Sequence, residues 1–253
     1  MQSNEIEILK DRFRLSEKTI ELYAEAEKEL ESEFKKIDDD AAYNQLKVLS
    51  EFQKNRVSYA HFGETSGYGY DDMGRDTLDK IYAGGFGAED AMVRHNIVSG
   101  TQAIAACLYG VLRPGDLLVS VAGRPYDTLE EVIGLRGESD SGSLADFGVT
   151  YGQVDLTESG EPDFGAIADK IEKNKVKAAL IQRSRGYDWR DSLTVDTIGE
   201  IIKTIKAADK DVICIVDNCY GEFVETKEPT DVGADLIVGS LIKNAGGSLA
   251  LSG

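Results

Sequence analysis

From residue 98 to residue 243, short apolar runs alternate with amphipathic stretches, and this alternation constrains the fold more than any other feature. Helical spacing of apolar residues marks Phe164 to Glu172 and Thr194 to Ala207. The apolar runs that we interpret as buried strands are Leu117 to Val121, Val149 to Val154, Lys177 to Gln182, Ile213 to Val216 and Leu236 to Val238, with a shorter candidate at Ala91 to Val93. Repeated strand–helix units predict an α/β fold with a mostly parallel sheet covered on both faces. Ligands bind such sheets at the carboxyl ends of the strands.

A lysine follows the last of these strands. Lys243 stands three residues after Ser240, and the glycines Gly246 and Gly247 come next. A lysine beside a buried strand costs free energy unless its charge has a partner or a chemical role. Such lysines shift their pKa readily, which suits them to Schiff-base chemistry. Taken alone, a solvated strand end is the more common explanation of this pattern.

An aspartate at the end of the preceding strand favours a chemical role for Lys243 over a solvated strand end. Asp217 directly follows Ile213 to Val216 and precedes Lys243 by 243 − 217 = 26 residues. This pair suits a pyridoxal phosphate site, in which the acid keeps the pyridine nitrogen protonated and the lysine carries the aldehyde. The alternative for Asp217 is a helix cap or a turn residue.

Further candidates stand at other strand ends and helix starts. Ser99 opens an apolar helix that we expect to run to Tyr109, and the backbone N–H groups at such a start form a natural phosphate site. A plain N-cap by Ser99 is compatible with that interpretation. Tyr126 lies at the predicted carboxyl edge of the sheet, where its ring can stack on a cofactor. Arg183 follows Gln182 at another strand end.

The charge balance excludes some classes of partner. Lys and Arg number 28 against 46 Asp and Glu, a net charge of −18 that argues against nucleic acid and anionic membranes. Met1 to Arg14 is charged throughout and no long apolar run follows, so we expect neither a signal peptide nor a membrane span. The three cysteines have no metal-ligand spacing. We expect free thiols in a cytoplasmic protein without a metal site.

The N-terminal part reads as a helical arm, which we assign to residues 1–60, ahead of a main domain at 61–253. The pattern predicts one amphipathic helix at Ser16 to Ile37, a break at Asp38 to Asp40, and a second helix at Ala41 to Lys54. Gly63 to Arg75 then forms a glycine-rich loop with tyrosines and an arginine, and a helix follows from Asp76 to Ala83. The loop is either a binding surface or an ordinary surface loop with packed tyrosines.

Several motifs together resemble a known family. The chain is similar to the fold-type I pyridoxal-phosphate enzymes of cysteine and methionine metabolism, and most of all to their methionine gamma-lyase-like or aluminium-resistance branch. The segments that carry the resemblance are Thr65 to Thr77, Val98 to Ala103, Leu112 to Asp116, Gly123 to Gly134, Gln182 to Tyr187, Val216 to Asn218 and Gly239 to Gly247. The resemblance implies the large domain of the aspartate-aminotransferase type, a three-layer α/β structure, with an N-terminal helical arm.

The resemblance also implies roles for individual residues. Lys243 matches the Schiff-base lysine, Asp217 the partner of the pyridine nitrogen, and Tyr126 the tyrosine stacked on the ring. The residues that match the phosphate site are Ser99, Gly100, Thr101 and Ser240. Tyr70 and Arg75 match residues that reach the phosphate of a neighbouring subunit, with Tyr68 as the alternative to Tyr70, and this implies a homodimer or homotetramer with shared active sites.

The sequence departs from the branch at three places. Gln102 replaces a usual histidine, Ala245 replaces a usual proline, and the chain ends at Gly253, so we expect the C-terminal small domain to be missing. The expected activity is carbon–sulfur bond cleavage in a sulfur-containing amino acid. The alternative is a truncated, catalytically incomplete protein or one half of a split enzyme. A nucleotide-binding Rossmann protein is disfavoured, because no Gly-x-Gly-x-x-Gly opens a helix after the first strand.

Overall fold

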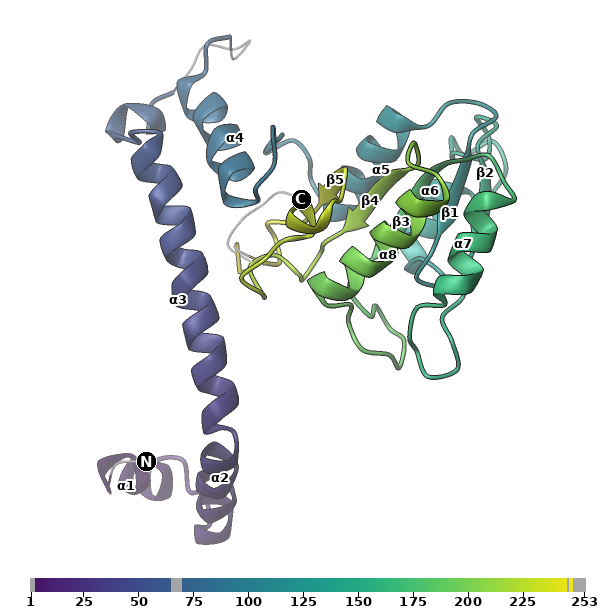
Figure 1. Ribbon diagram of the computed structural model, residues 1–253. Helices are drawn as coiled ribbons and strands as arrows, with labels where there is room; N and C mark the ends of the chain where they lie inside the picture. Colours follow the sequence, from purple (N-terminus) through teal and green to yellow (C-terminus); the bar gives the residue numbers. More distant parts are fainter. Residues whose placement is uncertain (1–2, 65–69, 245, 248–253) are drawn as a thin grey trace. The chain divides into compact units, whose positions relative to one another are not determined.

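The parallel sheet predicted from the apolar runs is present in the computed structural model, which describes residues 3–64, 70–244 and 246–247 (Figure 1). The chain divides into an N-terminal unit, residues 1–45, and a main unit, residues 46–253. In the described part of the main unit, five parallel strands follow the order β2-β1-β3-β4-β5. The strands are β1 (Leu117–Ser120), β2 (Thr150–Gln153), β3 (Val176–Gln182), β4 (Ile213–Asp217) and β5 (Leu236–Val238). The predicted domain boundary after residue 60 stays a prediction.

Helices cover both faces of the sheet, as the strand–helix alternation predicts. They are α5 (Gly100–Val111) and α6 (Asp127–Ile133) on one face, and α7 (Phe164–Glu172) and α8 (Val195–Ala208) on the other. Side chains alternate along each strand, so Leu118 packs toward α5 and α6 while Val119 packs toward α7 and α8. Each face therefore has its own apolar core.

The register of the central strands places the site candidates at one edge of the sheet. Gln182 of β3 is the register partner of Asp217 of β4, and Asp217 is in turn the partner of Val238 of β5. Because β3, β4 and β5 are parallel, their carboxyl ends lie at the same edge of the sheet. The starts of α5 and α6 lie at this edge too, since Tyr126, at the N-cap of α6, donates its backbone N–H to Gln182 Oε1.

The segment before the sheet differs from the prediction. Ala91 to Val93 forms no strand; instead, the Val93 N–H donates to Asp79 Oδ1 at 2.8 Å. The Asp79 side chain thus accepts the backbone hydrogen bond that a neighbouring strand would accept in a sheet. The preceding helix, α4 (Met73–Gly85), starts earlier than predicted, because Asp72 caps it by accepting the Arg75 N–H. Between α3 and α4 lies a 3-10 turn at Tyr59–Phe62, and another follows β4 at Pro229–Val232.

The N-terminal helices also break at a different residue. The structure has α1 (Ser3–Asp11), α2 (Glu17–Glu29) and α3 (Glu31–Lys54), so the interruption is at Leu30 and the predicted break at Asp38 to Asp40 is wrong. Aspartates cost a helix interior well under about 1 kcal/mol each. Lys35 pairs with Asp39 and Lys36 with Asp40, one helical turn apart, and these pairs offset part of that cost. Among the described residues, no helix is long and apolar enough to cross a membrane.

Candidate functional site

The start of α5 packs directly against the turn that follows β5. Ser99 caps the helix by accepting the Gln102 N–H at 3.2 Å, as predicted. Gly100 is buried, and a Cβ added there would lie 3.1 Å from both Cys219 Sγ and Ser240 Cβ. Only glycine allows this approach without displacing a neighbour. The free N–H groups of a 12-residue helix and the Ser240 side chain therefore meet at one place.

Tyr126 joins this helix start to the sheet. Its hydroxyl lies 2.9 Å from Thr101 Oγ1, and its backbone N–H donates to Gln182 Oε1, also at 2.9 Å. Burial raises the pKa of the Tyr126 phenol, and its hydrogen bonds to the hydroxyls of Thr101 and Thr128 oppose that rise. The ring is thus held neutral at the edge of the sheet where the resemblance expects a stacking tyrosine.

Asp217 is a buried acid beside the predicted lysine. It is 2% exposed, and its Oδ1 accepts the Cys219 N–H at 3.1 Å. Burial raises the pKa of the Asp217 carboxyl, while the charge of Lys243 acts in the opposite direction. A buried carboxylate of this kind gains from a further cationic hydrogen-bond donor, which a protonated pyridine nitrogen supplies.

Lys243 lies in a turn held by the loop that follows Asp217. Its Nζ is 4.8 Å from the centroid of the Tyr220 ring, and its backbone N–H donates to the Ser240 carbonyl at 2.9 Å. A cation over an aromatic face is attracted by the ring quadrupole. Tyr220 itself has φ of 68°, a left-handed conformation that directs the chain back toward the lysine turn.

These residues fit pyridoxal phosphate by the chemistry of their groups. The helix start with Ser99, Gly100, Thr101 and the adjoining Ser240 supplies N–H and hydroxyl groups for a phosphate. The buried acid Asp217 suits a protonated ring nitrogen, and Lys243 supplies the amine for an aldehyde. The structure brings this set together around one edge of the sheet.

Other predicted residues lie elsewhere or have other partners. Tyr70 is 80% exposed, and Arg75 lies in the first turn of α4, where its guanidinium pairs with Asp76 Oδ1 at 3.0 Å. Tyr68 lies outside the described residues. Arg183 is not at the site: it is buried and binds the Gly221 carbonyl at 2.7 Å, with further bonds to Leu193, Asn218 and Glu225. Its guanidinium holds the loop after β4 to the end of β3.

Three residues at the site were not singled out by the sequence analysis. Gln182 orients Tyr126, Tyr220 faces Lys243, and the Glu222 carboxyl accepts the Ser240 N–H at 3.0 Å. The available signals were modest: Gln182 is a polar residue at the end of an apolar run, and Tyr220 and Glu222 lie in the short stretch that follows Asp217. Their partners are distant in sequence, so periodicity does not reveal them.

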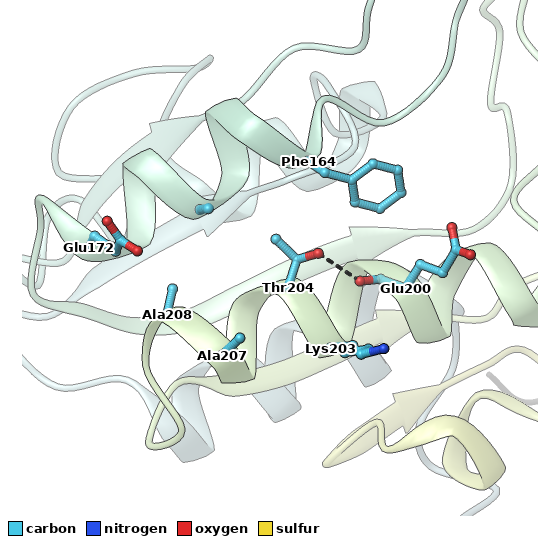
Figure 2. Close-up of a pocket in the computed structure, with 8 residues that line it drawn as sticks. Phe164, Glu172, Glu200, Lys203, Thr204, Ala207 and Ala208 are labelled. Atoms are coloured by element: carbon cyan, nitrogen blue, oxygen red, sulfur yellow. Dashed lines mark hydrogen bonds between the residues drawn. The ribbon is translucent and has the colours of Figure 1, made fainter.

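Hollows lie both away from the predicted cofactor groups and beside them. Figure 2 shows a surface groove between α7 and α8, where Thr204 donates to the Glu200 carbonyl and the charged side chains are Glu172, Glu200 and Lys203. A second cavity of about 420 Å³ runs along β5, and Glu222 is among its polar lining residues. Within the described ranges, no cluster of His, Cys, Asp and Glu is arranged to hold a metal ion.

The sequence and the fold match known proteins. The sequence profile of methionine gamma-lyase matches residues 19–253. A candidate cystathionine beta-lyase involved in aluminium resistance from Clostridium acetobutylicum superposes with a TM-score of 0.94 and 49% identity. A carbon–sulfur lyase involved in aluminium resistance from Clostridium novyi has the same TM-score and 48% identity. The sheet and its helices form the α/β fold of pyridoxal-phosphate-dependent proteins, as predicted.

The chain is shorter than these relatives. Both Clostridium structures cover 100% of this chain, which in turn covers 60% of each of them. YnbB, an uncharacterized protein of Bacillus subtilis, is 50% identical over 229 residues, which are 90% of this chain and 54% of YnbB.

Proposed function

The chain belongs to the methionine gamma-lyase family, and on this premise we propose that it binds pyridoxal 5′-phosphate and serves a carbon–sulfur lyase that acts on a sulfur-containing amino acid. The observation that carries the proposal is the position of Asp217 beside Lys243, with the start of α5 packed on Ser240. The names of the two Clostridium relatives support a carbon–sulfur lyase as the reaction class.

Each residue of the site has a part in this proposal. Ser99, Gly100 and Thr101 bind the phosphate through the N-terminal N–H groups of α5, and the Ser240 hydroxyl adds a donor. Asp217 would accept a hydrogen bond from the protonated ring nitrogen, and Tyr126 would lie against the ring. When bound, the cofactor withdraws electrons from the alpha carbon of an amino acid. Lys243 anchors the aldehyde and afterwards moves protons at the substrate carbons.

The proposal extends to assembly and location. Tyr70, or Tyr68, and Arg75 complete the phosphate site of a second copy, so the protein works as a homodimer or homotetramer. Tyr70 is largely exposed on the main unit, which supports a contact outside its own chain. The free thiols Cys107, Cys214 and Cys219 support a reducing compartment, and we assign the protein to the cytoplasm.

Borohydride trapping tests the proposal. The full 253-residue chain is mixed with pyridoxal phosphate, reduced with borohydride, digested and analysed by mass spectrometry. We expect the phosphopyridoxyl mass on Lys243, its loss in Lys243→Ala, and its retention in Lys227→Ala, since Lys227 pairs with Asp196 at the surface. Labelling of Lys243→Ala equal to that of the parent would refute the role of this lysine.

Turnover separates the proposal from its alternative. Release of a thiol and a 2-oxo acid from methionine or cystathionine by the cofactor-loaded chain that has not been reduced supports the lyase. Cofactor attachment without turnover supports the alternative, a protein that holds the cofactor but is catalytically incomplete or needs a complementary chain.

A further inference from the structure

The loop after β4 holds the Lys243 turn from both sides. On one side, the Glu222 carboxyl accepts the Ser240 backbone N–H at 3.0 Å. On the other, Asn244 Nδ2 donates to the carbonyls of Tyr220 at 2.8 Å and Glu222 at 3.1 Å. Ser240 and Asn244 flank Lys243 in sequence, so this loop fixes the backbone from which the lysine side chain departs.

The Glu222 carboxyl reaches the Ser240 amide through a very close approach. Glu222 is 5% exposed, and a Cβ added to Gly239 would lie 2.2 Å from its Oε1. Any side chain at position 239 would therefore displace the carboxyl. Glu222 Oε2 has no hydrogen-bond partner among the described residues. Leaving a buried oxygen unpaired costs roughly 1 to 3 kcal/mol, so the bond to Ser240 is kept at a cost to stability.

Glu228 provides a contrast within the same loop. It is also buried, but its Oε1 accepts the Phe223 N–H at 2.8 Å and its Oε2 accepts from Asn218 Nδ2 at 3.2 Å. Both of its oxygens are satisfied inside the loop that follows β4. Glu222, by contrast, directs its side-chain bond to a different segment of the chain, the one that carries Lys243.

We propose that Glu222 is a positioning residue for Lys243, which fixes the lysine turn by holding the Ser240 amide against the loop that follows Asp217. Glu222 acts through Ser240 and does not contact the cofactor. This role rests on the proposed function, because the position of Lys243 matters for attachment of the cofactor aldehyde. Asp217 and Lys243 belong to different strand ends, and the Glu222–Ser240 bond sets one end relative to the other.

Amide hydrogen exchange in the cofactor-free chain tests the contact directly. Glu222→Ala should speed exchange of the Ser240 amide about tenfold relative to the amides of β5, the effect of losing one hydrogen bond. Glu222→Gln should keep the protection, because its Oε1 accepts the same bond. Glu228→Ala is the matched control, a neighbouring buried acid whose loss should not single out Ser240. Equal Ser240 exchange in Glu222→Ala and Glu228→Ala would overturn the proposal.

Cofactor attachment tests the consequence. Glu222→Ala should weaken the borohydride-trapped attachment of pyridoxal phosphate to Lys243 about tenfold in apparent affinity, more than Glu228→Ala, and Glu222→Gln should restore it. Parental affinity in Glu222→Ala, or no rescue by glutamine, would overturn the proposal. A parent chain that attaches no cofactor refutes the proposed function instead. The exchange rate of the Ser240 amide then tests by itself whether Glu222 fixes the lysine turn. If Glu222→Ala does not fold, Gly239→Ala displaces the same carboxyl and is expected to produce the same changes.

Discussion

The side chain of Gln182 holds the backbone of Tyr126: its Oε1 accepts the Tyr126 N–H at 2.9 Å, across 56 residues of sequence. Gln182 is 4% exposed, and its Nε2 donates to the Ser184 carbonyl at 3.2 Å. The amide therefore has a fixed orientation at the end of β3. Because α6 begins after Tyr126, this bond fixes the backbone from which the ring departs, and the hydroxyl is held by Thr101.

Removing that amide tests its importance. Gln182→Ala leaves the Tyr126 N–H without its partner, and we expect a loss of roughly 1 to 3 kcal/mol in the free energy of unfolding. Apparent affinity for pyridoxal phosphate should fall as well. Gln153→Ala is the control, since Gln153 ends the edge strand β2 and its Oε1 accepts from Tyr151 instead. Urea unfolding and cofactor titration measure both effects, and a control variant with equally weakened cofactor binding would contradict this role.

The start of α5 allows a sharper comparison between two glycines of one helix. A Cβ at Gly100 would lie 3.1 Å from Cys219 Sγ and Ser240 Cβ, whereas a Cβ at Gly110 meets nothing within 4 Å. Gly100→Ala should therefore separate the helix start from Ser240 and weaken binding of the cofactor phosphate. Gly110→Ala should stabilise the chain by about 0.5 to 1 kcal/mol. Thermal unfolding and cofactor titration check both, and unchanged cofactor affinity in Gly100→Ala would argue against a phosphate site there.

The sequence predicts the strands and the strand-end residues because both depend on local pattern. Most of an apolar run such as Ile213 to Val216 is buried whichever neighbours the strand pairs with, and Asp217 follows directly. Glu222 and Gln182 escaped prediction because their partners, Ser240 and Tyr126, are 18 and 56 residues away. Their importance arises from tertiary contact, which periodicity does not encode.

The incorrect predictions have local causes as well. Asp38 to Asp40 looked like a helix break, but ion pairs from Lys35 and Lys36 one turn earlier accommodate two of the aspartates within α3. Ala91 to Val93 has strand-like composition, yet Asp79 takes the Val93 N–H. In both segments a side chain supplies a contact that intrinsic propensity does not consider.

The stability of the cofactor-free chain should depend on pH through Glu222. Burial, with added repulsion from the Glu228 and Asp217 carboxylates, raises its pKa from 4.5 to about 7, although the backbone N–H groups of Glu222 itself and of Ser240 oppose this. Folding therefore favours the protonated acid. That contribution is complete below pH 4.5 and is lost as the pH rises through about 7.

Glu222→Gln should flatten this dependence. Between pH 5 and pH 8 the parent chain should lose up to roughly 3 kcal/mol more than the variant in its free energy of unfolding. The pKa values of Asp217, Glu228 and Tyr82 are also raised, chiefly by burial, so some dependence on pH remains in the variant. Urea unfolding at the two pH values measures the difference. Parallel curves for parent and variant would contradict the elevated pKa of Glu222.

Asp217→Asn separates cofactor binding from proton transfer. Asparagine has nearly the same size, so much of the cofactor should remain bound, but it does not hold a protonated ring nitrogen as a carboxylate does. We expect the exchange of the substrate alpha proton for deuterium to slow by about a hundredfold or more. Exchange at the parental rate in this variant would leave Asp217 as a turn residue only.

The last prediction is that two chains share each active site. Arg75 pairs with Asp76 at the surface of α4, and such an exposed pair is worth about 0 to 1 kcal/mol. The guanidinium therefore gives up little when it turns to a phosphate, which it binds with a matching fork of donors. Arg75→Ala should weaken cofactor binding, while Arg136→Ala, an exposed arginine after α6, should not. Dilution to monomers should weaken binding in the parent chain too, because the ligand stabilises the assembly that holds the complete site.

Mixed dimers decide between a shared site and a self-contained one. A dimer of one Arg75→Ala chain and one Lys243→Ala chain contains one site with a parental lysine and a parental arginine from the partner subunit. If the arginine acts across the interface, mixing should restore cofactor attachment to that one site. If Arg75 acts within its own chain, each site of the mixed dimer lacks either its lysine or its arginine, and mixing restores nothing. Mixed dimers without restored affinity, or a parent chain that stays monomeric with cofactor fully bound, would exclude the shared site.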